Sequence, residues 1–206
     1  EESGIKNLKS EGIDTSTVHF VGNIMIDTLS NHFRNVENKK EDYVLMTFHR
    51  PSNVDTVKGL EKIHRICSQI KNPMVFPVHP RTEKRMMDYG FFDKFKSIKR
   101  LKIIPPQGYL EFLNLMQKSK AVITDSGGIQ EETTFLRIPC LTLRKNTERP
   151  STIDIGTNIL VDTAEEVTEQ LQKIENGTFK TADIPKLWDG NTALRITKII
   201  EKFLEI

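Results

Sequence analysis

The 206-residue chain is long enough for one large hydrophobic core, or for one core with an appended piece of a neighbouring unit. With 37% hydrophobic and 28% charged residues, it has the composition of an ordinary globular protein. The net charge of +2 is too small to indicate binding to nucleic acid or to a membrane surface. Any anion that the protein binds must therefore be held by a local arrangement of groups.

The two cysteines, Cys67 and Cys140, have no spacing typical of a disulfide or a metal site. The charged N-terminal segment EESGIKNLKSEGI is unlike a signal peptide, and no apolar run approaches the roughly 18 residues of a membrane span. We therefore expect a soluble, cytoplasmic protein with reduced cysteines and without a bound metal.

Short apolar runs alternate along the chain with longer amphipathic stretches. A polar helix is expected at residues 2–11. Strands are expected at residues 18–21, 43–48, 74–78, 103–104, 121–124, 140–143 and 158–161. Helices are expected at residues 54–70, 81–92, 109–118, 127–136, 164 to about 175, and 192–204. The first and last helices stand outside the alternating pattern, so we expect both to contact another domain or a second chain.

The strands are short and apolar, without the alternation of a half-exposed sheet, which indicates a sheet buried on both faces. Because helices separate them, the sequence predicts βαβ units and a Rossmann-like α/β fold, a parallel sheet with helices on both faces. In such folds ligands bind at the carboxyl ends of the strands. The residues that directly follow strands are therefore the functional candidates: His49 and Arg50, His79, residues 125–128, and Arg144 onward.

The strongest local signal is TDSGGIQEE at residues 124–132, where a strand ends and a helix begins. Glycines let a ligand approach the backbone, and the N–H groups and dipole of the helix favour an anion. Ser126 adds a hydroxyl donor, and Glu132, on the second turn, could accept from a ribose diol. The alternative is that Asp125 or Ser126 only caps the helix while the glycines form the turn.

Three cations, Arg144, Lys145 and Arg149, follow the strand at residues 140–143. Near an anion-binding helix they could clamp a diphosphate, since arginine binds phosphate in a bidentate geometry. Ordinary solvated surface charge is the alternative explanation.

Two histidines, His49 and His79, stand directly after predicted strands. At that position an imidazole could bind a phosphate or assist a leaving group, although a purely structural role stays open for both. Gln107 and Phe112 begin another helix, where Phe112 could pack on a planar base and Gln107 could bond its edge. Core packing of Phe112 is the alternative. The residues alone predict a domain that binds an anionic ligand, such as a nucleotide.

Five collinear motifs together resemble the C-terminal half of the non-hydrolysing UDP-N-acetylglucosamine 2-epimerases. They are TFHRPSNVD, FPVHPRT, PPQGYLEFLNLM, VITDSGGIQEETTFLRIPCLTLRKNTERP and WDGNTALRI. The resemblance implies the two-domain GT-B fold, with the substrate in a cleft between two Rossmann-like domains. It also implies interconversion of UDP-N-acetylglucosamine and UDP-N-acetylmannosamine without metal or nicotinamide, by anti elimination of UDP and its re-addition.

The resemblance further implies a role for individual residues. Ser126, Gly127 and Gly128 would contact the phosphates, Glu132 the ribose, and Gln107 and Phe112 the uracil. Arg149 and His49 would lie near the diphosphate, with His49 as the catalytic residue of this half. Arg50 and His79 occupy places that in bacterial members help to bind a second, activating substrate molecule. Ser52 departs from the pattern, because many members have a glutamate there.

The implied domain organisation has three parts. Residues 1–17 would be the remnant of an N-terminal domain and a linker, residues 18–190 the UDP-binding domain, and residues 191–206 a helix that crosses to the missing N-terminal domain. The acid/base carboxylates belong to that missing domain, so we expect this chain alone to be inactive and the full-length enzyme to be a homodimer. The alternatives are a GT-B glycosyltransferase, a hydrolysing epimerase, and a non-catalytic nucleotide-binding module.

Overall fold

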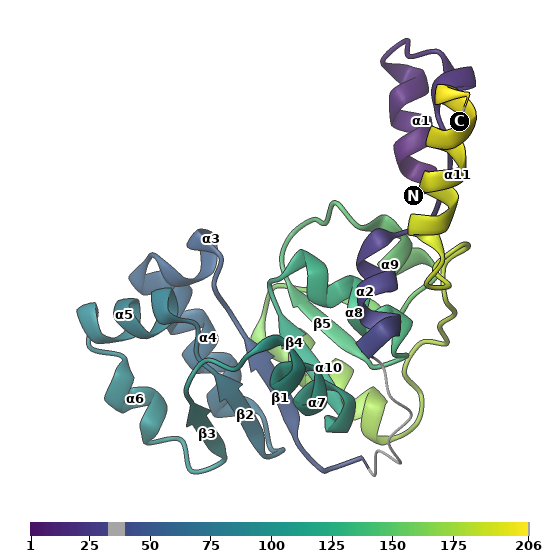
Figure 1. The fold of residues 1–206 in the computed structure, drawn as a ribbon. Coiled ribbons are helices and arrows are strands. Elements are labelled where there is room, and N and C mark those ends of the chain that lie inside the picture. The colour runs from purple at the N-terminus through teal and green to yellow at the C-terminus, as the bar shows by residue number, and fades with distance from the viewer. Residues whose placement is uncertain (33–39, 206) are drawn as a thin grey trace.

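The computed structural model describes residues 1–32 and 40–205 (Figure 1). In this part of the chain six strands form one sheet: β1 (Val44–Thr47), β2 (Met74–Pro77), β3 (Leu101–Ile104), β4 (Ala121–Thr124), β5 (Cys140–Leu143) and β6 (Asn158–Val161). Their order is β3-β2-β1-β4-β5-β6, and every neighbouring pair is parallel. This is the strand order of a doubly wound Rossmann fold, so the predicted fold class is confirmed.

Helices cover both faces of the sheet, which explains why β1, β4 and β5 are buried along their whole length (Figure 1). The first face packs against α3 (Pro51–Val54), α4 (Val57–Gln69), α5 (Pro80–Asp88), α6 (Phe92–Lys96) and α10 (Ala164–Glu175). The second face packs against α2 (Ile24–His32), α7 (Tyr109–Lys118) and α8 (Gly127–Phe135). Successive residues of β1 supply the two cores, since Met46 belongs to the first and Leu45 to the second.

The expectation of a strand at residues 18–21 is wrong. The segment is irregular and lies between η1 (Thr15–Thr17) and α2, outside the sheet. The Arg195 side chain donates to the Val21 carbonyl over 3.1 Å, so a side chain satisfies a group that a neighbouring strand would otherwise bind. The backbone then passes close to Leu187, because a Cβ on Gly22 would lie 2.2 Å from the Leu187 oxygen. Helix α2, which follows, was not predicted.

The helix expected at residues 54–70 is α4, and the short helix α3 before it was not predicted. Thr56 begins α4 as its N-cap and accepts a hydrogen bond from the Gly59 N–H over 3.1 Å. The two helices then pack so tightly that a Cβ on Gly59 would lie 2.2 Å from the Asn53 oxygen. Glycine at this position therefore permits the close approach.

The helix expected at residues 81–92 ends earlier, at Asp88. Gly90 has φ +68° and donates to the Met87 carbonyl, while the next amide, that of Phe91, donates to the Met86 carbonyl over 2.7 Å. This is the Schellman pattern of hydrogen bonds, with glycine in the left-handed conformation that ends the helix. A separate helix, α6, follows. The short helix α9 (Pro150–Asp154), after β5, was also not predicted.

Helices α1 (Glu2–Ser10) and α11 (Thr192–Leu204) extend away from the sheet, at the same end of the molecule (Figure 1). Helix α1 has no buried residue, and α11 has only Thr192. The buried Asp27 of α2 anchors the start of α11, because its carboxylate accepts from the Thr192 N–H over 3.0 Å and the Ala193 N–H over 2.7 Å. A carboxylate suits the N-terminus of a helix, where N–H groups have no partner within the helix.

We predict that Asp27→Ala lowers the free energy of unfolding by about 1–2 kcal/mol, the usual cost of losing a helix cap. Asp189→Ala is the matched control, because Asp189 is also close to the start of α11 but forms an exposed ion pair with Arg195. It should cost less than about 1 kcal/mol. Urea unfolding followed by circular dichroism measures both. Equal losses in the two variants would contradict the proposed anchoring role of Asp27.

Candidate functional site

The strand order places the candidate site between β1 and β4. These strands are neighbours in register, with Thr47 opposite Thr124. The chain leaves β1 toward the first face, through α3 and α4, and leaves β4 toward the second face, through α8. A crevice at the carboxyl ends of two strands whose connections diverge is the usual ligand site of this fold. Residues 49–50 and 125–128 both lie at this point.

Asp125 is fully buried, and its carboxylate holds the segment that follows β1. It accepts from the His49 N–H over 3.1 Å, from the Arg50 N–H over 3.0 Å and from the Asn53 side-chain amide over 3.0 Å. The same Asn53 amide also donates to the Leu143 carbonyl at the end of β5. Asp125 therefore ties the ends of β1 and β5 to the end of β4. The sequence suggested only a capping role for this residue.

His49 stands beside Asp125 with its ring partly in solvent. Its Nδ1 lies 3.3 Å from the Asp125 carboxylate, and 40% of its side chain is exposed. The centroid of the His79 ring lies 5.6 Å away. His79 is the N-cap of α5, where its Nδ1 accepts from the Arg81 N–H over 3.1 Å. Partial burial lowers the pKa of His79, and the neighbouring His49 and Arg81 add to the effect.

The start of α8 is open at Gly128. Ser126 is the N-cap of α8, but its side chain makes no capping bond, so the capping alternative does not describe its hydroxyl. A Cβ on Gly128 would meet nothing within 4 Å, whereas a Cβ on Gly127 would lie 3.3 Å from a Glu148 carboxylate oxygen and 3.9 Å from Nη2 of Arg149. The structure thus brings Arg149 next to the free N–H groups of the helix. Both are donor groups of the kind that bind anions.

Arg149 is held on its inner side by Glu131. Its Nε lies 3.0 Å from a Glu131 carboxylate oxygen, which also accepts from the Asn23 side-chain amide over 2.8 Å. Burial raises the pKa of Glu131, although Arg149 and Asn23 oppose the rise. Neither Glu131 nor Asn23 was a candidate from the sequence, since a glutamate on a helix and an asparagine before one carry no local signal of this contact.

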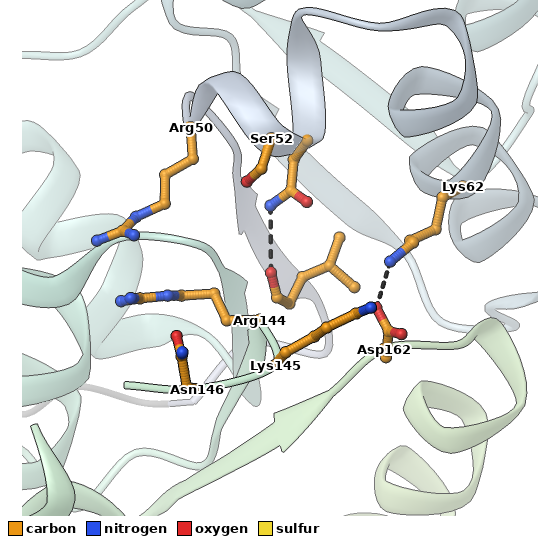
Figure 2. Close-up of a pocket in the computed structure, with 9 residues that line it drawn as sticks. Arg50, Ser52, Lys62, Arg144, Lys145, Asn146 and Asp162 are labelled. Carbon is orange, nitrogen blue, oxygen red and sulfur yellow. Dashed lines mark hydrogen bonds and ion pairs between the residues drawn. The ribbon is translucent and has the colours of Figure 1, made fainter. Parts of the chain in front are cut away.

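The other two cations that follow β5, Arg144 and Lys145, have different surroundings from Arg149. Arg144 is 9% exposed and pairs with Glu148, the two groups being 2.6 Å apart, and the opposite oxygen of Glu148 lies 3.0 Å from Arg50. The Arg144 hydrogen bond and the charge of Arg50 lower the pKa of Glu148 to about 2. Lys145 instead lines a cavity of about 310 Å³ with Arg50, Arg144 and other residues (Figure 2). The carboxylate of Glu148 therefore neutralises part of the positive charge of Arg50 and Arg144.

Glu132 lies on α8 and is almost fully buried. Burial raises the pKa of its carboxyl to about 7, and the nearby Glu131 adds to the rise, whereas a hydrogen bond with the Tyr109 hydroxyl opposes it. Tyr109 begins α7, so this contact joins the starts of α7 and α8. Tyr109 is a further residue of the site that the sequence analysis left out.

The two predicted base-binding residues lie around the start of α7. The amide of Gln107 donates to the Pro105 carbonyl over 2.8 Å, so its side chain folds back on its own loop. Phe112 is half-buried and packs against the core of the second face. Packing against the core, which the sequence analysis gave as the alternative for Phe112, is therefore one of its roles.

Two absences hold for residues 1–32 and 40–205. No group of three or more His, Cys, Asp or Glu side chains in these ranges is placed to hold a metal ion. None of the helices in the same ranges is long and apolar enough to cross a membrane.

Comparison with known proteins identifies relatives over nearly the whole chain. The family model described as UDP-N-acetylglucosamine 2-epimerase matches residues 1–201. The UDP-N-acetylglucosamine 2-epimerase of Methanocaldococcus jannaschii is 42% identical over an alignment of 171 positions, gaps included, that covers 75% of this chain and 47% of the relative. That of Methanococcus maripaludis is 36% identical over an alignment of 220 positions that covers 97% of this chain and 58% of the relative. The chain thus spans about half the length of these curated relatives.

Solved structures give the same result. A crystal structure of the Methanocaldococcus jannaschii UDP-GlcNAc 2-epimerase in complex with UDP-GlcNAc and UDP matches with a TM-score of 0.78 and 38% identity. The match covers 96% of this chain and 58% of that one. The Neisseria meningitidis UDP-GlcNAc 2-epimerase bound to UDP-GlcNAc matches with a TM-score of 0.76 and 30% identity, over 98% of this chain and 60% of that one. The chain belongs to the UDP-N-acetylglucosamine 2-epimerase family.

Proposed function

We propose that this chain is the UDP-binding part of an epimerase that interconverts UDP-N-acetylglucosamine and UDP-N-acetylmannosamine. The observation that carries the proposal is the meeting of Arg149 with the glycine-rich start of α8 on one open surface, beside the exposed ring of His49. A diphosphate needs several donors directed at neighbouring oxygens, and these groups supply them. The UDP and UDP-GlcNAc in the structures of relatives support the same ligand class.

The proposed binding mode assigns one part of UDP to each part of the site. The N–H groups of Gly127 and Gly128, the Ser126 hydroxyl and the Arg149 guanidinium bind the diphosphate. Glu132 accepts from the ribose diol. The uracil packs near Phe112, and Gln107 reaches its edge after its amide leaves the Pro105 carbonyl. The diphosphate donors matter most for the reaction, because fixed donors stabilise the negative charge that builds up as UDP departs.

His49 is the proposed catalytic residue of this part. The Asp125 carboxylate lies on the Nδ1 side of the ring, so the other nitrogen is available to the diphosphate. Donation from that nitrogen would assist the departure of UDP as the C2 proton is removed. UDP then re-adds at C1 while a proton returns to the opposite face of C2, which inverts that carbon. Elimination and re-addition are redox-neutral, so the proposed reaction needs no nicotinamide.

The remainder of the enzyme is also part of the proposal. Removal of the C2 proton requires a base, which we assign to a preceding domain linked through residues 1–17. The helix at residues 191–206 would cross to that domain, and residues 18–190 would form the UDP-binding domain. The full-length enzyme would be a homodimer, and this chain alone inactive. Arg50 and His79 would help to bind a second, activating substrate molecule, for which Arg50 must leave Glu148.

We predict that Arg149→Ala and Ser126→Ala weaken UDP binding to this chain. Arg149→Ala should raise the dissociation constant about 10- to 100-fold, because a hydrogen bond to a charged group contributes about 1.5–3 kcal/mol. Arg65→Ala is the control, since Arg65 lies on α4 and forms an exposed pair with Glu165. Isothermal titration calorimetry measures all three variants. Unchanged affinity in Arg149→Ala and Ser126→Ala would remove the proposed diphosphate site.

A second prediction concerns pH. Because the pKa of Glu132 is about 7 in the free protein, its carboxylate is mostly ionised at pH 8 and mostly protonated at pH 6. Only the ionised form accepts fully from a ribose diol, so UDP affinity should fall up to roughly tenfold from pH 8 to pH 6. Glu132→Gln has no such titration. The ratio of wild-type affinity to Glu132→Gln affinity should therefore decrease as the pH is lowered from 8 to 6. A ratio that stays constant over this range would contradict the ribose contact.

Unfolding measurements provide a control for the same group. The folded-state pKa of Glu132, about 7, lies above the ordinary value of 4.5 that the unfolded chain has. The stabilising effect of this group is thus fully present below pH 4.5 and lost as the pH rises through 7. Glu132→Gln should then be more stable than the wild type at pH 8, and equally stable at pH 4.

The third prediction requires the full-length enzyme. His49→Asn should lower turnover about 10²-fold or more, the low end for a lost acid/base group. Substrate affinity should change much less, because the interaction strengthens only as UDP departs. In D₂O the wild type should incorporate deuterium at C2, and the variant should slow this incorporation and epimer formation together. A folded variant with near-normal turnover would return His49 to a structural role.

A further inference from the structure

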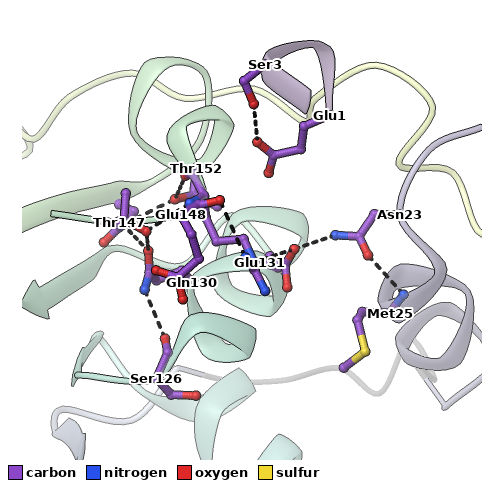
Figure 3. A network of polar contacts seen from close by, with 12 residues as sticks. Glu1, Ser3, Asn23, Met25, Ser126, Gln130, Glu131, Thr147, Glu148 and Thr152 are labelled. Carbon is purple, nitrogen blue, oxygen red and sulfur yellow. Dashed lines mark hydrogen bonds and ion pairs between the residues drawn. The ribbon is translucent and has the colours of Figure 1, made fainter. Parts of the chain in front are cut away.

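A chain of buried hydrogen bonds joins the two segments of the candidate diphosphate site (Figure 3). Its centre is Gln130 on α8, which is fully buried. The amide nitrogen of Gln130 donates to the Ser126 carbonyl over 3.1 Å. Its amide oxygen accepts from the Thr147 hydroxyl over 2.7 Å and from the Asn158 amide over 3.0 Å. One side chain therefore contacts the turn before α8 and the loop after β5.

The Thr147 hydroxyl carries this connection to Arg149. It donates its one proton to Gln130, and its oxygen accepts from the Arg149 N–H over 3.0 Å. A second path reaches the other side of the same residue. The Asn158 amide donates to the Thr152 hydroxyl over 3.2 Å, and that hydroxyl donates to the Arg149 carbonyl over 2.7 Å. Both main-chain polar groups of Arg149 are thus linked to Gln130.

The hydrogen bond from Gln130 to the Ser126 carbonyl also sets the direction of the Gly127 N–H, a proposed donor to the diphosphate. The Ser126 carbonyl and the Gly127 N–H belong to one planar peptide unit and point in opposite directions. A bond from Gln130 that holds the carbonyl inward therefore directs the Gly127 N–H the opposite way, out of the N-terminal end of α8. Gln130 thus orients a donor of the helix and, through Thr147, the backbone that carries the Arg149 guanidinium.

We infer that Gln130 and Thr147 are positioning residues that hold the Gly127 amide and Arg149 at the spacing needed to bind one diphosphate together. The inference rests on the proposed function, because it concerns the same UDP site. It adds a requirement on the ligand. A ligand with adjacent phosphates contacts both groups at once and depends on their spacing, whereas uridine contacts neither.

The test uses two substitutions at Thr147, which is half-buried at the edge of the chain of bonds. Thr147→Val keeps the shape of the side chain but removes the hydroxyl, while Thr147→Ser keeps the hydroxyl. UDP is titrated by calorimetry and uridine by NMR chemical shifts. We expect Thr147→Val to raise the dissociation constant for UDP about tenfold and to leave that for uridine unchanged. Thr147→Ser should bind both like the wild type.

A ligand-free measurement separates this inference from the proposed function. Amide hydrogen exchange at Arg149 should be at least several-fold faster in Thr147→Val, because its N–H loses its acceptor, while exchange at Val167 in the core stays the same. Unchanged Arg149 exchange, unchanged UDP affinity, or equal losses for UDP and uridine would each overturn the inference alone. A wild-type chain that binds no UDP would overturn the proposed function, and with it the diphosphate role of Thr147.

Discussion

The buried carboxylate of Asp125 is the contact on which the rest of the site depends. At the point where the chain diverges from β1 and β4, several backbone and side-chain N–H groups would otherwise be buried without acceptors. An unpaired buried donor costs about 1–3 kcal/mol, so one carboxylate that accepts from three of them fixes the local backbone. The partly exposed ring of His49 has its position because the backbone N–H of His49 is bound to the Asp125 carboxylate.

Acidic side chains position the cations of the site in the same manner. Glu131 holds Arg149 from the inner side, and Glu148 bridges Arg50 and Arg144. Each pairing orders a long, flexible side chain before any ligand arrives, which reduces the entropy cost of binding. The Arg149 guanidinium faces Glu131 through Nε and donates from Nη1 to the Glu148 carbonyl, so its Nη2 group stays available to an anion. The acidic partners therefore make Arg149 a rigid donor and do not simply cancel its charge.

Much of the fold could be predicted from the sequence, because the strands are short, apolar and separated by amphipathic helices. All six observed strands were placed to within two residues at each end, and the helix that starts at Gly127 was placed at its first residue. The expected strand at residues 18–21 failed for a tertiary reason: a run of apolar residues becomes a strand only where a neighbouring strand accepts its hydrogen bonds. There, the Arg195 side chain satisfies the Val21 carbonyl instead.

The sequence by itself determined the parallel α/β class, the position of His49 after a strand and the glycine-rich start of α8, because these depend on local periodicity and on the residue types in a turn. Only the tertiary structure decided that Asp125 binds the segment after β1, that Glu131 orients Arg149, and that Gln130 joins the two segments of the candidate diphosphate site. Hydrogen bonds between distant segments leave no mark in the local pattern of either one. The partners of a buried polar side chain are therefore set by how the strands and helices pack, which the sequence pattern does not contain.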